Sequence, residues 1–138
     1  MFDTPDLICQ GGALDMIDLG IQDVRVFVPA QDFAVSQGFY EALGWQTDYL
    51  DPQLALMRNG THRFYLQRAY VRAWAENLML HVTVADARAC HAQIATVLQG
   101  DAFPGARVAA PRHEPYGALV TYVWDPAGVL LHLAQWDA

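Results

Sequence analysis

The sequence predicts an α+β domain in which two β-α-β-β-β repeats form a cupped mixed sheet around a central cavity. Two observations lead to this prediction. The same order of patterns, a strand followed by a capped helix and three short strands, occurs twice along the 138 residues. A turn glycine also recurs before the last strand of each repeat, at Gly60 and at Gly128. Two anchors in the same order indicate a duplication.

Length and composition place the chain among single globular domains. Its 138 residues, 54% hydrophobic and 17% charged, are enough to bury a core without disulfides. The net charge of −7 argues against nucleic acid as a partner, because phosphate binding needs clustered Lys and Arg. The acidity is compatible with a cationic ligand, and also with plain solubility.

The chain shows neither a membrane-length apolar run nor a basic region ahead of an apolar stretch at its start. We therefore expect no membrane partner and no secretion signal. Cys9 and Cys90 form no spacing motif, which favours reduced thiols and a cytoplasmic location.

The first repeat spans residues 21–67. Residues 1–20, which have no clear period, are interpreted as an N-terminal arm that could pack on a partner subunit. Alternation from residue 21 predicts a half-buried strand carried by Val24, Val26 and Val28. Asp32 is placed to cap a helix that ends at Gly44. Three short strands are expected to complete the repeat, at residues 45–50, 54–58 and 62–67.

The second repeat spans residues 78–135, within a domain that covers 21–138. A polar and aromatic linker at 68–77 precedes it. Val82 and Val84 alternate with polar residues, and Asp86 caps a helix that runs to about residue 98. Strands are expected at residues 106–110, 119–124 and 129–135.

Aligning the repeats by hand shows how they would build a site. The alignment, with two extra residues in the first turn, makes these matches: Val28 with Val84, Asp32 with Asp86, Gly60 with Gly128 and Gln67 with Gln135. Each repeat is then one layer of strands covered by one helix. Pairing the repeats leaves their inner sheet faces lining a shared hollow, where small-molecule sites tend to lie.

Two motifs carry a resemblance to a known superfamily. They are the segment DFAVSQGFYEALGW at 32–45 and the turn DPAG at 125–128, which leads into VLL at 129–131. They resemble the helix and the D-P-x-G turn of the vicinal oxygen chelate superfamily, to which glyoxalases, bleomycin resistance proteins and extradiol dioxygenases belong. The resemblance covers about residues 21–135 and is specific for the fold. It leaves the function open, because members include isomerases, dioxygenases, thiol transferases and metal-free binding proteins.

The resemblance also implies where a metal would bind. Enzymes of this superfamily hold a divalent metal through one residue of the first strand and one of the last strand of each half. On the alignment above, these positions are Asp23, Phe64, Met79 and His132. Two of the four are unsuited, and a catalytic ion needs at least three good ligands, so we expect no cofactor. The alternative is an unusual divalent-metal site formed by Asp23, His81 and His132, with Gln67 as a further candidate.

Seven side chains are the candidate ligand-binding residues: Asp23, Arg25, Phe64, His81, Tyr116, Trp124 and His132. His132 is either a core histidine or a cavity residue. Arg25 either pairs internally with Asp23 or anchors an anionic group of a ligand. Tyr116 belongs to segment 112–117, a loop that is similar in position to one closing the cavity mouth in the superfamily. Trp124 could stack on a flat ligand. No residue is assigned a catalytic role.

Three functions follow as hypotheses. The first is a homodimer that binds a drug or metabolite without metal, as the resemblance to bleomycin resistance proteins implies. The alternative is a metal-dependent lyase, isomerase or dioxygenase of the same superfamily. A regulatory or interaction module is the third, and it rests only on the arm. The sequence leaves open whether the protein is an enzyme, and whether the halves pair within one chain or across a dimer.

Overall fold

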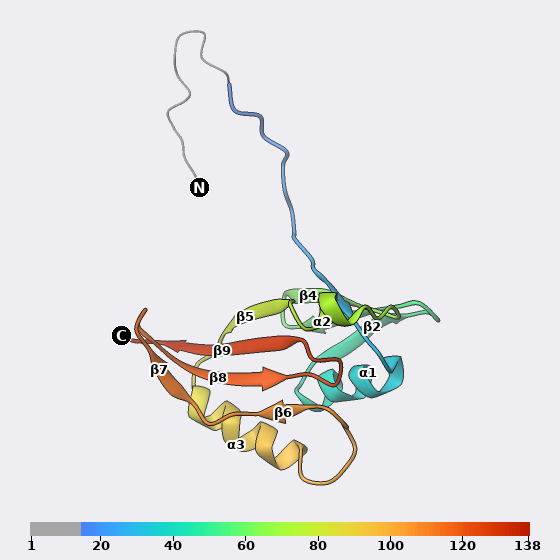
Figure 1. Ribbon diagram of the computed structural model, residues 1–138. Coiled ribbons are helices and arrows are strands. Elements are labelled where there is room, and N and C mark those ends of the chain that lie inside the picture. Colours follow the sequence, from blue (N-terminus) through green and yellow to red (C-terminus); the bar gives the residue numbers. More distant parts are fainter. Residues whose placement is uncertain (1–14) are drawn as a thin grey trace.

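The computed structural model describes residues 15–138, so most of the predicted arm lies outside the described part. The first half is a four-stranded sheet with the strand order β1-β4-β3-β2. Its strands are β1 (Phe27–Pro29), β2 (Gln46–Leu50), β3 (Leu54–Asn59) and β4 (His62–Gln67). Helix α1 (Phe33–Ala42) covers one face of this sheet (Figure 1).

The second half is a five-stranded sheet. Four strands follow the order β5-β9-β8-β6, and β7 pairs with β8. Their bounds are β5 (Met79–Thr83), β6 (Arg107–Val108), β7 (Arg112–Glu114), β8 (Ala118–Trp124) and β9 (Leu130–Trp136). Helix α3 (Ala87–Val97) lies against one face (Figure 1), and the short helix α2 (Arg72–Ala75) lies in the linker. In both halves the first strand pairs in parallel with the last, which confirms the predicted fold of two β-α-β-β-β repeats.

Local sequence explains where both helices begin. The Asp32 carboxylate accepts a hydrogen bond from the Val35 amide at 3.2 Å, and the Asp86 carboxylate accepts one from the Ala89 amide at 3.0 Å. Each bond satisfies an amide that the first helical turn leaves without a partner. The two N-caps are thus equivalent, as the sequence predicts.

Two segments differ from their predictions. The first strand is shorter than expected, because only Phe27–Pro29 has a neighbouring strand in β4. Residues 15–26 form no strand. The part before Asp23 projects from the body of the molecule (Figure 1), whereas Arg25 bonds to Tyr65 and Val26 packs against the core. Segment 112–117, expected as a loop, instead contains β7, whose residues pair with the start of β8.

One hydrophobic core joins the two halves. At its centre the buried Tyr40 hydroxyl donates a hydrogen bond to the Asp125 carboxylate at 2.6 Å. Phe39 packs edge-on against Phe103, with ring centroids 5.7 Å apart. Tyr40 belongs to the helix motif and Asp125 to the turn motif, so the two motifs that carry the resemblance contact each other across the boundary between the halves.

The hydrogen-bond register corrects the alignment of the repeats. The Ala30 amide donates to the Gln67 carbonyl, and the Val84 amide donates to the Ala134 carbonyl, both at 2.9 Å. Ala30 and Val84 each stand two residues before an N-cap, so Ala30 matches Val84 without any insertion. The predicted matches of Val28 with Val84 and of Gln67 with Gln135 are therefore wrong.

The error in the last strand comes from the turns that precede it. The β3–β4 turn closes after the pair Asn59–His62, whereas the β8–β9 turn closes after the pair Trp124–Leu130. The two turns differ in length, so counting from their glycines misplaces the last strand by one residue. In a strand, a shift of one residue moves every side chain to the opposite face.

Candidate functional site

A groove of about 890 Å³ lies between the two halves. The end of α1 and strand β4 contribute one side of it, and β5, α3 and β9 contribute the other. Most of its walls are apolar side chains, among them Leu43, Trp45, Phe64, Val82, Ile94 and Leu131. Two of the predicted ligand-binding residues, Phe64 and His81, line this groove.

Polar side chains occupy a minor part of the groove wall. They include Asn59, His62, Arg63, His81, Thr83 and Gln93. No aspartate or glutamate is among the lining residues of the described chain. The groove therefore combines apolar walls with a few hydrogen-bonding groups, which is the usual make-up of a small-molecule site.

The remaining predicted residues, Asp23, Arg25, Tyr116, Trp124 and His132, do not line the groove. Phe64 and Leu66 of β4 are buried in the core beneath α1, so Arg63 and Tyr65 lie on the other face. We call the face of each sheet that is turned away from its helix the open face.

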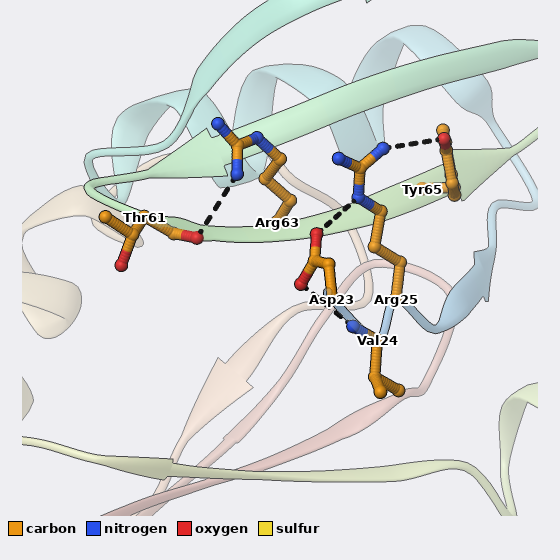
Figure 2. Close-up of polar contacts among 6 residues, drawn as sticks. All are labelled: Asp23, Val24, Arg25, Thr61, Arg63 and Tyr65. Carbon is orange, nitrogen blue, oxygen red and sulfur yellow. Dashed lines mark hydrogen bonds and ion pairs between the residues drawn. The ribbon is translucent and has the colours of Figure 1, made fainter. Parts of the chain in front are cut away.

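On the open face of the first half, Arg25 makes two polar contacts (Figure 2). Its guanidinium donates to the Asp23 carboxylate at 2.9 Å and to the Tyr65 hydroxyl at 2.8 Å. The hydrogen bond from Arg25 lowers the pKa of Asp23, helped by the Val24 amide. Phe27 stacks on Tyr65 with ring centroids 5.0 Å apart. The sequence left two roles open for Arg25, an internal pair with Asp23 or an anchor for an anionic ligand group. The structure shows the internal pair.

On the open face of the second half, His132 lies among aromatic and sulfur-containing side chains. Its Nε2 is 3.4 Å from the Met79 sulfur, and its ring centroid is 6.1 Å from that of His81 and 4.9 Å from that of Tyr122. Partial burial lowers the pKa of His132, and the nearby His81 lowers it further. Trp136 extends the cluster, with its ring centroid 5.5 Å from that of His81. His132 is thus an open-face residue and not a core histidine.

Tyr116 and Trp124 lie at two ends of the same sheet. Tyr116 is 52% exposed in the turn between β7 and β8, and its ring centroid is 5.7 Å from that of Trp136. The Arg107 guanidinium covers the ring of Trp124 at 3.6 Å from its centroid. Trp124 is therefore already stacked on a cation within the chain.

The expected opposition of Phe64 and His132 across a hollow is wrong. Phe64 is only 2% exposed and packs against Tyr40 and Trp45, with ring centroids 4.9 and 4.8 Å away. It shares this core with Leu131, the neighbour of His132 that points to the opposite face of β9. The true counterpart of His132 is Tyr65, because Phe27 pairs with Tyr65 as His81 pairs with His132.

The corrected register changes the positions where the superfamily enzymes hold their metal. Counted from the matched pair Ala30 and Val84, these positions are Arg25, Tyr65, Met79 and His132. The first two are bonded to each other, as are the last two. Only His132 is an ordinary ligand of a divalent ion, and the Arg25 cation would repel one. These residues do not fit a divalent metal.

The looser predicted set does not assemble either. Asp23 is engaged by Arg25 in the first half, whereas His81 and His132 lie in the second. Within residues 15–138, no group of three or more His, Cys, Asp or Glu side chains is arranged to hold a metal ion.

The sequence reasoning missed three residues of these surfaces. Arg63 is not among the predicted ligand-binding residues, yet it lines the groove. Tyr65 and Trp136 received no place in the site. Strand alternation with the correct register would have placed Tyr65 on the face of Arg25, since the parallel pairing of β1 with β4 brings them together.

No protein-family model and no curated protein matches the chain. Within residues 15–138, no helix combines the length and apolarity needed to cross a membrane.

Solved structures do match. A bleomycin resistance determinant encoded on transposon Tn5 has a TM-score of 0.71 and 22% identity, over 85% of this chain and 100% of that one. The bleomycin-binding protein of Streptomyces verticillus, complexed with copper(II)-bleomycin, has a TM-score of 0.70 and 24% identity, over 85% and 99%. A glyoxalase/bleomycin resistance protein/dioxygenase from Nocardioides has a TM-score of 0.68 and 14% identity, over 88% and 87%. The chain shares the fold of these proteins.

Proposed function

We propose that the protein binds a small organic molecule in the groove between its halves, and that this binding needs no metal. The observation that carries the proposal is the groove itself, a cavity of about 890 Å³ with apolar walls from both halves. Ligand pockets usually measure about 300–1,000 Å³ and carry few polar groups. Structural neighbours that bind bleomycin support a binding role for this fold.

The metal-dependent alternative has less support. Its chemistry requires a Lewis acid, and the positions that would hold one carry an arginine, a tyrosine and a methionine beside His132. A binding protein requires only the groove.

We also propose that the protein is a homodimer and that it lies in the cytoplasm, because Cys9 and Cys90 form no spacing motif. Large apolar side chains are exposed both on residues 15–24 and on the open faces. Met16 is 89% exposed, Leu19 73%, Met79 62% and Trp136 47%. Apolar surface of this extent marks a contact site, and a second copy of the chain would cover it.

Calorimetric titration of the EDTA-treated protein with 2-naphthol and octan-1-ol tests the proposed site. The variant Val97→Trp places an indole in the groove, and we expect it to weaken binding at least about tenfold by excluding the ligand. Thr96→Trp is the matched control, because Thr96 is exposed on the neighbouring position of α3 and does not line the groove. Unchanged binding by Val97→Trp, or binding that appears only with added divalent metal, contradicts the proposal.

A further inference from the structure

The charge of the groove is opposite to the charge of the molecule. The chain has 15 acidic and 8 basic residues, giving a net charge of −7. The lining nevertheless contains no carboxylate, and its one guanidinium belongs to Arg63. His62 and His81 add imidazoles that can only be neutral or positive. A ligand in the groove therefore meets a positive or neutral wall.

Arg63 also has hydrogen-bonding capacity to spare. Its guanidinium makes a single long hydrogen bond to the Thr61 carbonyl, at 3.4 Å. No carboxylate of residues 15–138 lies within 4.0 Å of it, in contrast to four other arginines. The nearby Arg25 is already engaged with Asp23 and Tyr65 (Figure 2). Because a guanidinium offers five N–H donors, most donors of Arg63 remain available.

We infer that the ligand of the groove is an apolar or aromatic molecule that ends in one anionic group, such as a carboxylate. The apolar body lies along walls that include Trp45, Val82 and Ile94, and the anion pairs with Arg63. Paired N–H donors of a guanidinium match the two oxygens of a carboxylate. This inference rests on the proposed function and assigns the chemical class of its ligand.

The acidic surface of the protein does not prevent an anionic ligand from binding in the groove. Charges separated by more than about 8 Å are largely screened at physiological ionic strength. The remaining repulsion slows the approach of an anion, so the association rate for an anionic ligand increases with salt. Once the ligand is bound, the contacts of the groove decide its affinity.

Three eight-carbon probes separate the contribution of the charge from that of the apolar body. We expect octanoate to bind more tightly than octan-1-ol, and octan-1-ol more tightly than octylamine, in calorimetric titrations of the full chain. Arg63→Gln should weaken octanoate binding about tenfold and leave octan-1-ol binding unchanged. Arg88→Gln is the matched control, because Arg88 is exposed on α3 and does not line the groove.

The outcomes distinguish this inference from the proposed function. If octan-1-ol binds but octanoate binds no more tightly, or if Arg63→Gln has no effect on octanoate, the groove is a binding site and the anionic class is wrong. If none of the probes binds, both fail. If octanoate binds only to a chain that lacks residues 1–20, the arm occupies the groove, and the inference is overturned.

Discussion

The hydrogen bond between Tyr40 and Asp125 is a buried polar contact that joins the two halves. Tyr40 is 1% exposed and Asp125 is fully buried. The Asp125 carboxylate also accepts bonds from the Ala127 and Val129 amides, at 2.8 and 3.0 Å. One side chain thus shapes the β8–β9 turn and ties it to α1, because a buried carboxylate needs every donor it can reach.

Tyr40→Phe removes the hydroxyl and should destabilise the protein by about 1–3 kcal/mol, because it leaves a buried oxygen of Asp125 without a donor. Urea unfolding measures the effect. Tyr49→Phe is the control, since the exposed Tyr49 donates to Asp51 at the surface, and we expect a loss below about 0.5 kcal/mol. Equal losses in the two variants would show that burial does not set the strength of the Tyr40 bond.

The same carboxylate predicts a pH dependence. Burial raises the pKa of Asp125, against the opposing effect of its hydrogen bond from Tyr40. The folded chain therefore holds this proton more tightly than the unfolded chain, whose value is near 3.8. The contribution of Asp125 to stability is fully present below that value and is lost as the pH rises through the folded pKa.

We therefore expect the free energy of unfolding of the natural protein, minus that of Asp125→Asn, to decrease as the pH rises from about 4 towards neutral. Denaturant unfolding of both proteins at a series of pH values measures this difference. A difference that stays constant or increases over the same range would contradict the assigned direction.

At the scale of single residues, the sequence indicates which side chains are candidates for a site better than it indicates which of them are in contact. The pairing of Arg25 with Asp23 was one of two readings, and the structure contains it. The groove position of Arg63 could not be predicted, because the opposite side of the groove comes from β5 and α3 in the other half. Only the packing of the two halves brings them together.

The two helices are the elements that the sequence predicts best. Each begins at an aspartate that caps it, and the cap is a local signal that needs no tertiary contact. Strand register, in contrast, depends on the length of the turn, and the unequal β3–β4 and β8–β9 turns made the hand alignment wrong by one residue. This one-residue error in the alignment matched Phe64 with His132, whereas the residue of the first half that corresponds to His132 is Tyr65.

The equivalence of the two caps gives a prediction for these elements. Asp32→Ala and Asp86→Ala should each cost about 1 kcal/mol of stability, and Asp32→Asn and Asp86→Asn should keep most of it, because asparagine also accepts the amide hydrogen bond. Chemical unfolding of the four variants measures this. Asparagine variants as unstable as the alanine variants would show that the negative charge, and not the cap bond, stabilises the helices.

Two surfaces of residues 15–138 expose large apolar side chains, and the first is the segment ahead of β1. The strand predicted from residue 21 begins only at Phe27. The Val26 carbonyl still accepts a hydrogen bond from the Tyr65 amide at 2.9 Å, but residues 21–25 make no backbone hydrogen bond to a neighbouring strand. Residues that alternate as in a strand but lack a neighbour suggest that another chain supplies one. The open faces, with Met79 and Trp136 exposed, are the second such surface.

Sedimentation velocity should therefore show a dimer for the full chain and a shift towards monomer for a chain that lacks residues 1–20. Met79→Lys tests the open face separately, because a charge in the contact should also weaken association. Glu76→Lys is the control, because Glu76 lies at the surface, at the end of helix α2 in the linker. We expect this variant to leave the association of the two chains unchanged. A full chain that sediments as a monomer at all concentrations would refute the homodimer.

The central claim is that the groove between the halves is the ligand site, and Cys90 allows it to be tested directly. Cys90 lines the groove, and its side chain is partly accessible. In a Cys9→Ser background it is the only thiol of the chain. The measurement is the rate at which iodoacetamide alkylates Cys90 as the concentration of octan-1-ol increases. We predict that the rate decreases with the same concentration dependence as calorimetric binding, and a rate that stays constant while the protein becomes saturated would place the ligand elsewhere.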